Sequence, residues 1–522
     1  GESGSGKSVT ALALMGLLPP HLSKINSGRI LFCNNDLLSH SHSEMRKIRG
    51  KDIAMIFQEP MSSLNPSMPC GHQVGEILKE HLKLNSSEVK AEVLKLFEQV
   101  KLPHPSRIYN AYPHEISGGQ KQRVMIAMAI ACKPKLLIAD EPTTALDVTV
   151  QKDILDLLKD IQKETQMSVL FISHDLALVS QIADKVIVMY RGEIVEQGSK
   201  SSIFHNPEHP YTKALIGARP STKCRVKTLP TISDFMANRV KKVVITKQER
   251  HKRHKTLYSQ KPLLEVNDVE KTYISKAGWF KPNRIFKAVK GVSFKVYPGE
   301  TFGLVGESGC GKSTLGNVIL QLDTATAGTI HYKGKDITNL SKTQLRQLRK
   351  DIQIVFQDPF ASLNPRLRVG EAILEPMKVH KICQDSKKGR LKVMEILESV
   401  GLSQGDFDKF PHEFSGGQRQ RIGIARTIAL NPKLIICDES VSALDISVQA
   451  QVLNLLNNLK AEYSFTYIFI SHDLSVVKYM ADQLLVMNEG KIEEIGEADE
   501  VFSNPKKTYT KQLIDAIPSG IE

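Results

Sequence analysis

The amino-acid sequence predicts an α/β protein built from two tandem copies of one domain, each with a parallel-sheet core. Three observations predict this fold. Five motifs recur in the same order in both halves of the 522 residues. Apolar runs such as LLIAD (136–140) alternate with amphipathic stretches such as 150–164, and this alternation is typical of a parallel sheet covered by helices. Residues are 41% hydrophobic and 24% charged, as expected for globular domains.

The repeat defines the domain organisation. GESGSGKS (1–8) returns as GESGCGKS (306–313), and DEPTTALD (140–147) returns as DESVSALD (438–445). The stretches that begin FQ, the segments around SGGQ and the two copies of FISHDL also pair. We therefore predict a first domain at 1–220, a connecting segment at 221–261 and a second domain at 262–522.

The two halves differ at their starts. Residues 262–305 alternate like antiparallel strands and end in the apolar run TFGLV, which leads into the second Gly-rich loop. The first half begins directly at its loop, with Gly1. A strand–loop–helix motif needs its strand. We therefore expect an antiparallel β subdomain in the second copy, and a first copy whose β subdomain is truncated.

The connecting segment is strongly basic. Residues 221–261 hold 12 Lys and Arg against one Asp and one Glu, in a chain of net charge +14. We expect this segment to be a flexible, solvated tether, with a span of roughly 35 Å that allows the two domains to pair. Basic charge of this kind also suits RNA or anionic lipid, so both partners stay open at this point.

Several classes of protein are excluded by composition. No apolar run approaches the roughly 20 residues of a membrane-spanning helix, and from the first residues we expect no secretory leader. None of the seven cysteines forms a C-x-x-C pair, so neither a zinc site nor a disulfide framework is indicated. We expect a reduced, cytosolic environment.

Two Gly-rich loops of the pattern G-x-x-x-x-G-K-S predict phosphate binding. Glycines let backbone N–H groups converge on phosphate oxygens at a helix N-terminus. Lys7 and Lys312 would reach the β- and γ-phosphates of ATP, and Ser8 and Ser313 would ligate Mg²⁺. The predicted loop residues are Gly1, Ser3, Gly4, Gly6, Lys7 and Ser8 in the first copy, and Gly306, Ser308, Gly309, Gly311, Lys312, Ser313 and Thr314 in the second.

An acidic pair closes one apolar strand in each copy. Asp140 and Asp438 would hold the Mg²⁺ hydration shell. Glu141 and Glu439 follow directly and could polarise the attacking water. Isolated acids at strand ends are often only solvated, but this pair recurs 298 residues apart beside the other motifs.

With SGGQ at Ser117–Gln120 and Ser415–Gln418, the set resembles the nucleotide-binding domain of ATP-binding cassette (ABC) proteins, twice over. The resemblance implies a helical subdomain in each copy, and ATP and Mg²⁺ as cofactors. It implies catalytic roles for Glu141, His174, Glu439 and His472, and metal contacts from Gln58 and Gln357. Tyr273 would stack on adenine. Nucleotide contacts are also implied for the signature residues Ser117, Gly118, Gly119, Ser415, Gly416 and Gly417.

The signature has no obvious partner within its own domain, because the Gly-rich loop already holds the phosphates. Two half-sites per domain imply head-to-tail pairing, with ATP between the halves. One site would combine Lys7, Asp140, Glu141 and His174 with 415–417. The other would combine Lys312, Asp438, Glu439 and His472 with 117–119.

Two functions compete at this stage. FQEPMSSLNP (57–66), FQDPFASLNP (356–365) and the tails 206–216 and 504–514 resemble the oligopeptide, dipeptide and nickel importers, and the fusion is similar to glutathione and microcin-type peptide importers. That resemblance implies two permeases, an extracytoplasmic solute-binding protein, peripheral placement at the cytoplasmic face of the inner membrane, and no nucleic acid. The alternative is a soluble double-cassette ATPase that acts on ribosomes through the basic segment.

In the importer hypothesis, the stretches after Gln58 and Gln357 receive a permease helix. Met61, Leu64, Phe360 and Leu363 would line that groove, although the two leucines could instead pack inside their own domain. The clustered cysteines that some members of the group carry after the tail are missing here, so no iron–sulfur cluster is expected.

Overall fold

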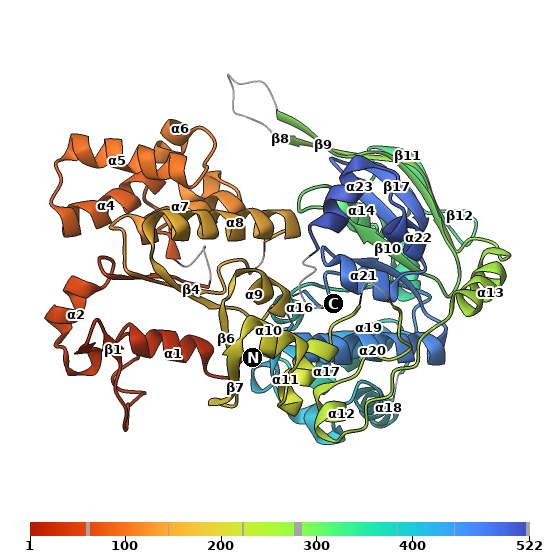
Figure 1. Cartoon of the computed structure of the whole chain (residues 1–522). Coiled ribbons are helices and arrows are strands. Elements are labelled where there is room, and N and C mark those ends of the chain that lie inside the picture. Colours follow the sequence, from red (N-terminus) through yellow and green to blue (C-terminus); the bar gives the residue numbers. More distant parts are fainter. Residues whose placement is uncertain are drawn as a thin grey trace. The chain divides into compact units, whose positions relative to one another are not determined.

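The structure is a computed structural model that describes residues 1–58, 63–144, 146–221, 224–275, 284–383, 385–442 and 444–517 (Figure 1). Its contacts divide the chain between Ile216 and Gly217 into two units. Each unit is described by itself, beginning with the second.

The second unit is built on a six-stranded sheet. The order is β13 (Ile352–Val355), β14 (Leu434–Asp438), β15 (Thr466–Ile470), β10 (Thr301–Val305), β16 (Gln483–Asn488) and β17 (Lys491–Glu497). All neighbours are parallel except the antiparallel pair β16–β17. Every residue of β10 and β15 is buried, which explains why these strands read as nearly continuous apolar runs. The predicted α/β fold with a parallel-sheet core is confirmed.

The strands of a second, antiparallel sheet lie between residues 264 and 336 of this unit. Its strands are β12 (Lys335–Asp336), β11 (Ala327–Tyr332), β8 (Leu264–Ser275) and β9 (Arg284–Val296), in that order. The alternation in the sequence before the Gly-rich loop predicted these strands, because one face of such a sheet packs on the core while the other meets solvent.

The remaining elements of the second unit are helical. Ile373, Val393 and Ile422 belong to one buried cluster that joins α17, α18 and α19 into the predicted helical subdomain. The helices are α14 (Lys312–Ile319), α15 (Lys342–Asp351), α16 (Pro359–Ser362), α17 (Val369–Val379), α18 (Ser386–Ser399), α19 (Gly416–Ile428), α20 (Ile446–Tyr463), α21 (Leu474–Met480), α22 (Ala498–Ser503) and α23 (Thr508–Asp515), with 3-10 turns η3 (Gln404–Asp408) and η4 (Pro411–Glu413).

The first unit repeats this plan with three smaller sheets. They are β3 (Ile53–Ile56), β4 (Leu136–Asp140) and β5 (Ser168–Ile172), all parallel; the antiparallel pair β6 (Lys185–Tyr190) and β7 (Glu193–Ser199); and the antiparallel pair β1 (Leu31–Phe32) and β2 (Asn35–Asp36). The helices are α1 (Lys7–Leu14), α2 (His42–Ile48), α4 (Cys70–Leu82), α5 (Ser86–Gln99), α6 (Pro105–Asn110), α7 (Gly118–Ile130), α8 (Val148–Thr165), α9 (Leu176–Ile182), α10 (Lys200–His205) and α11 (Pro210–Gly217), with 3-10 turns η1 (Leu37–Ser39) and η2 (Pro113–Glu115).

The two cores differ at one strand. In the second unit β10 lies between β15 and β16 and pairs with both. Within the described residues of the first unit no strand pairs with both β5 and β6, so its core sheet is in two pieces. The side chains of β5 are accordingly less buried than those of β15, because burial of a parallel strand needs a neighbour on each side.

The basic segment is not the flexible tether that we expected. Its described residues form part of the second unit and contain α12 (Ile232–Met236) and α13 (Lys247–Tyr258). Val226 and Leu229 belong to the buried core of that unit. The N–H of Leu229 donates to the side-chain oxygen of Asn454 (2.9 Å), and its carbonyl accepts from the same amide (2.8 Å). The expectation was wrong because composition counts charges but does not show their partners.

Acidic side chains of the second unit pair with cations of this segment. The Arg225 guanidinium donates to Asp499 at 3.0 Å and to the carbonyl of Tyr479 at 2.7 Å. Arg250, which is 8% exposed, lies 2.9 Å from Asp499 through Nε and donates to the carbonyl of Asp482 at 3.1 Å. These guanidinium groups satisfy backbone carbonyls just beyond the C-terminus of α21, where a helix leaves acceptors open.

Replacement of Arg250 by methionine should destabilise the second unit. The side-chain volume is largely kept, but the half-buried carboxylates of Glu497 and Asp499 lose a cation and the Asp482 carbonyl loses a donor, which costs about 1.5–3 kcal/mol. We expect the denaturant midpoint of this unit to fall, as followed by amide exchange in β10 and β16. Lys252→Met, on the exposed face of the same helix, is the control. Equal midpoints for the two variants would contradict a structural role for the segment.

Candidate functional site

Each Gly-rich loop is shaped by glycines in the left-handed region. In the second unit Gly309 and Gly311 have φ of 79° and 107°, and a Cβ at Gly311 would lie 2.4 Å from the carbonyl oxygen of Ala288. A side chain is therefore excluded at Gly311 both by strain and by space. Helix α14 begins at the next residue, so its N–H groups open toward the loop. Gly4 and Gly6 repeat this geometry in the first unit, with φ of 75° and 98°.

The loop lysines lie within their own loops. Lys312 Nζ donates to the carbonyls of Gly306 (2.7 Å) and Glu307 (2.9 Å). Lys7 makes the same two bonds, to Gly1 (2.7 Å) and Glu2 (2.8 Å). An ammonium group has three donors, and here it is placed where phosphates of a bound nucleotide would compete for them. Ser3 and Ser308 lie at the exposed tips of the two loops.

Two of the three predicted metal ligands, the serine and the aspartate, meet in each unit, while the glutamine bonds to the neighbouring glutamate. Ser313 Oγ lies 3.1 Å from Asp438 Oδ1, and Ser8 Oγ lies 3.1 Å from Asp140 Oδ1. Burial raises the pKa of both aspartates above its ordinary value, against the hydrogen bond from each serine. A hydroxyl and a carboxylate oxygen side by side are the hard ligands that Mg²⁺ takes, with phosphates and water supplying the rest. The donor set therefore fits Mg²⁺.

The predicted catalytic glutamates are each held by a glutamine and a histidine. Gln357 Nε2 donates to Glu439 at 2.9 Å, and His472 Nδ1 lies 3.2 Å from the same carboxylate. In the first unit Gln58 and His174 each lie 3.0 Å from Glu141. The motifs that supply these side chains are far apart in sequence, and the sheet brings them together at the carboxyl ends of β13, β14 and β15 and of their first-unit counterparts.

Both glutamates carry unusual backbone geometry and stay ionised. Their φ angles are 49° and 46°, a region that costs strain for residues other than glycine and that clusters at functional sites. Their N–H groups are fixed by the carbonyls of Ile172 and Ile470, each at 2.9 Å. Burial raises the pKa of each glutamate, but the hydrogen bond and charge of the neighbouring histidine outweigh it, so the pKa is lowered overall. An ionised carboxylate can orient and polarise a water molecule.

The signature serines cap helices. Ser117 and Ser415 are the N-caps of α7 and α19, with capping boxes to Gln120 and Gln418. The second glycine of each signature is needed for packing, since a Cβ at Gly119 would lie 2.9 Å from Val150, and one at Gly417 would lie 2.2 Å from Val448. The first glycine is different. A Cβ at Gly416 would meet nothing within 4 Å, and one at Gly118 would make only an ordinary contact.

Tyr273, on β8, lies at the same end of the second unit as the phosphate loop. Its hydroxyl donates to Asp323 at 2.7 Å and also hydrogen-bonds with Thr314 on α14. The side chain is 41% exposed, and Lys271 Nζ lies 5.0 Å from the ring centroid. The predicted contact of Thr314 and Tyr273 with a nucleotide stays a prediction.

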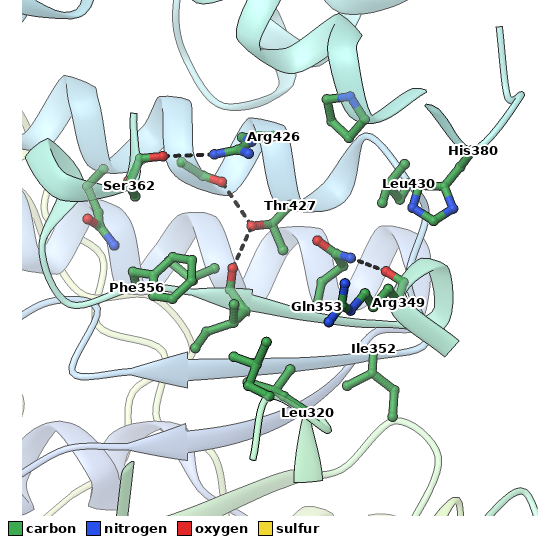
Figure 2. Close-up of a pocket in the computed structure, with 16 residues that line it drawn as sticks. Leu320, Arg349, Ile352, Gln353, Phe356, Ser362, His380, Arg426, Thr427 and Leu430 are labelled. Atoms are coloured by element: carbon green, nitrogen blue, oxygen red, sulfur yellow. Dashed lines mark hydrogen bonds between the residues drawn. The ribbon is translucent and has the colours of Figure 1, made fainter. Parts of the chain in front are cut away.

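A pocket that the sequence did not predict lies beside Gln357. It has a volume of about 260 Å³ and lies among β13, α17 and α19 of the second unit (Figure 2). Phe356, 46% exposed, lies on its wall with Pro376, His380 and Leu430. Arg426 donates to the Ser362 carbonyl at 2.8 Å. The sign of this pocket in the sequence was a phenylalanine directly before each glutamine, Phe57 and Phe356. The structure shows that the Phe57 side chain is exposed as well, by 41%.

The residues that we expected in this groove are placed differently. Leu64 and Leu363 are 2% and 4% exposed, so they pack inside their own domains, as the alternative interpretation held. Met61 and the side chain of Phe360 lie outside the part of the chain that the structure describes. Over the described residues no helix is long and apolar enough to cross a membrane.

Comparisons with known proteins find relatives that match nearly the whole chain. A family model described as ABC transporter matches residues 1–144 and 289–442, and one described as Oligopeptide/dipeptide transporter, C-terminal region, matches 195–242 and 494–520. Glutathione import ATP-binding protein GsiA of Escherichia coli O6:H1 is 47% identical over 524 residues, which is 99% of this chain and 84% of that protein. The proteins of the same name from Pectobacterium atrosepticum and Salmonella choleraesuis are 45% and 46% identical over the same shares.

Proposed function

This chain belongs to the ABC transporter family, as an ATP-binding protein of the oligopeptide and dipeptide importer type, and from that premise we propose that it hydrolyses ATP at two Mg²⁺-dependent sites to drive uptake of short peptides. One observation carries the proposal of two active sites. Each unit holds the same set of lysine, serine–aspartate pair and glutamate with its glutamine and histidine partners. The relatives are glutathione import proteins, which favours a short peptide as cargo over a role on ribosomes.

Mg²⁺ would be held by the Ser8–Asp140 and Ser313–Asp438 pairs, with the amide oxygens of Gln58 and Gln357 as further ligands. When bound, the ion would neutralise charge on the β- and γ-phosphates. Glu141 and Glu439 would orient water, and His174 and His472 would donate to the γ-phosphate as its charge changes.

We further propose that the signature of each half completes the ATP site of the other. The open space at Gly416 supports this, because packing within its own unit does not require a glycine there. A ligand that approaches the backbone closely would require one. Ser415–Gly417 would then face the nucleotide held by Lys7, and Ser117–Gly119 the nucleotide held by Lys312.

Membrane permeases are the partners that an importer ATPase needs, and we propose the pocket beside Gln357 as the docking site for one of them. An exposed phenylalanine beside the glutamine that contacts Glu439 would let a permease helix sense nucleotide-driven movement. Arg349 and Arg426 line this pocket and give it a basic character. Burial lowers the pKa of His380, and the charges of Arg346 and Lys350 lower it further.

The corresponding surface of the first unit has a different chemistry. The 298-residue offset of the repeat aligns Arg426 with Met128 and Gly423 with Met125. A cation and an open position in one copy therefore correspond to two methionines in the other. This difference favours two non-identical permeases. As part of an importer, the chain would act at the cytoplasmic face of the membrane, with a solute-binding protein that delivers the peptide from outside.

The variant Phe356→Glu tests the docking proposal. It places a charge on the wall of the pocket, so we expect loss of membrane association and of peptide uptake, with ATP binding kept within about twofold. Lys335→Glu, an exposed charge reversal on β12, is the control. If Phe356→Glu remains on membranes and supports uptake at the level of the control, the pocket does not hold a permease.

A further inference from the structure

A tyrosine from the tail of each cassette contacts the phosphate loop. The N–H of Glu307 donates to the hydroxyl of Tyr509 at 3.2 Å, and the N–H of Glu2 donates to the hydroxyl of Tyr211 at 3.0 Å. Glu2 and Glu307 are the second residues of the two Gly-rich loops. The tyrosines occupy the same position in the repeated tails NPEHPYTKALI and NPKKTYTKQLI, which lie about 200 residues after the loops.

The peptide group that each tyrosine contacts also accepts a hydrogen bond from the lysine of the phosphate loop. The carbonyl of Gly306 belongs to the same peptide group as the N–H of Glu307, and it accepts from Lys312 Nζ at 2.7 Å. The carbonyl of Gly1 belongs to the peptide group of the Glu2 N–H, and it accepts from Lys7 Nζ at 2.7 Å. The tyrosine hydroxyl therefore fixes the orientation of the peptide from which the lysine must depart to reach a phosphate.

The tail that carries each tyrosine is itself anchored to the sheet. The carboxylate of Glu494 on β17 accepts from the N–H groups of Lys506 (3.0 Å) and Lys507 (3.2 Å). Glu196 on β7 accepts in the same way from Glu208 (2.9 Å) and His209 (3.2 Å). Burial raises the pKa of both glutamates, but these backbone donors contribute to a net lowering. Ionised carboxylates thus fix the start of α11 and α23, with the tyrosine as the second residue of each helix.

Both tyrosines also fill space, so packing is the competing explanation. Tyr211 is fully buried and its ring centroid lies 4.2 Å from that of Tyr190. The repeat places Asn488 at the position of Tyr190, so the second unit has no such ring pair, and Tyr509 packs partly buried against its core. Ring packing differs between the copies, whereas the bond from the hydroxyl to the loop amide is present in both.

We infer that Tyr211 and Tyr509 are positioning residues for the two phosphate loops, and that the tail following each cassette thereby sets its nucleotide affinity. The hydroxyl holds the Glu2 or Glu307 peptide in the shape that receives phosphate. Without this hydrogen bond the loop is less ordered before ATP binds, and the cost of ordering it reduces the net free energy of ATP binding. The effect falls on ATP binding rather than on the chemical step, since each hydroxyl bonds to the loop that holds the phosphates.

The double variant Tyr211→Phe/Tyr509→Phe in the full 522-residue chain tests this inference. Loss of one hydrogen bond per loop should raise KM for ATP about two- to tenfold, with kcat within about twofold. Amide exchange over residues 306–311 should become faster. The control is Tyr332→Phe on β11, outside the nucleotide site. It removes a hydroxyl that lies 3.3 Å from the carboxylate of Asp351 on α15.

Three measurements separate positioning from packing. A melting temperature equal to that of Tyr332→Phe, together with a raised KM and faster loop exchange, supports positioning. A lowered melting temperature with an unchanged KM overturns it, and so does unchanged exchange in the loop. ATP binding and hydrolysis are measured without permeases, so the outcome does not depend on the docking site or on the peptide cargo.

Discussion

Replacement of Glu439 by glutamine is expected to reduce ATP turnover by about 10²–10⁴-fold, the contribution of a positioned general base. The amide keeps the shape of the side chain and its contact with Gln357 but removes the negative charge that polarises water. ATP affinity should change little, because Lys312 and the Ser313–Asp438 pair are untouched. Turnover is measured by phosphate release and affinity by equilibrium binding of ATP.

Glu141→Gln is the matched variant in the first unit, where the carboxylate has the same partners. If ATP is hydrolysed only when both sites are complete, either single change should reduce total turnover well below half. Half of the wild-type rate in both variants would show independent sites and would contradict the proposal of shared sites. A wild-type rate in Glu439→Gln would exclude this residue as the base.

Replacement of Lys312 by methionine is expected to weaken ATP binding at the second site by about 10- to 150-fold. Hydrogen bonds from a charged donor contribute roughly 1.5–3 kcal/mol, and methionine keeps the length of the side chain while removing all three donors. The lysine is only 5% exposed, so its replacement by an apolar side chain should not expose new surface. Isothermal titration with ATP and Mg²⁺ measures the change.

Two further variants serve as the control for that titration and assign its phases to the two loops. Lys335→Met removes an exposed charge on β12 and should bind ATP as the wild type does. Lys7→Met should leave the second site intact, so the two loop variants together assign each phase of the titration to one loop. Wild-type affinity in both phases of Lys312→Met would contradict the role of this lysine in phosphate binding.

Much of the site could be predicted because its parts are local in sequence. Gly306 to Ser313 form one turn between a strand and a helix, and the left-handed glycines allow only a narrow set of shapes for that turn. The pairs Ser8–Asp140 and Ser313–Asp438 could be predicted because parallel strands of one sheet end at the same edge. The fold followed from the repeat and from the buried apolar runs.

Other features depended on partners that composition does not show. The cations of 225–258 looked like a solvated tether, yet Arg225 and Arg250 pair with Asp499 in the second unit. The pocket at Phe356 needed three elements to meet. The contact from Tyr509 to Glu307 joins residues 202 positions apart, and the repeat of both motifs was its only trace in the sequence.

The sequence by itself determined the two-copy architecture, the phosphate loops and the identity of the glutamates that directly follow β4 and β14. These features rest on short-range rules, in which a few neighbouring residues decide backbone shape and burial. Only the tertiary structure decided which side chains hold those glutamates, where the basic segment packs and what fixes each phosphate loop from behind. Those contacts join distant segments, and their free energy depends on distances and burial that exist only once the sheet has assembled.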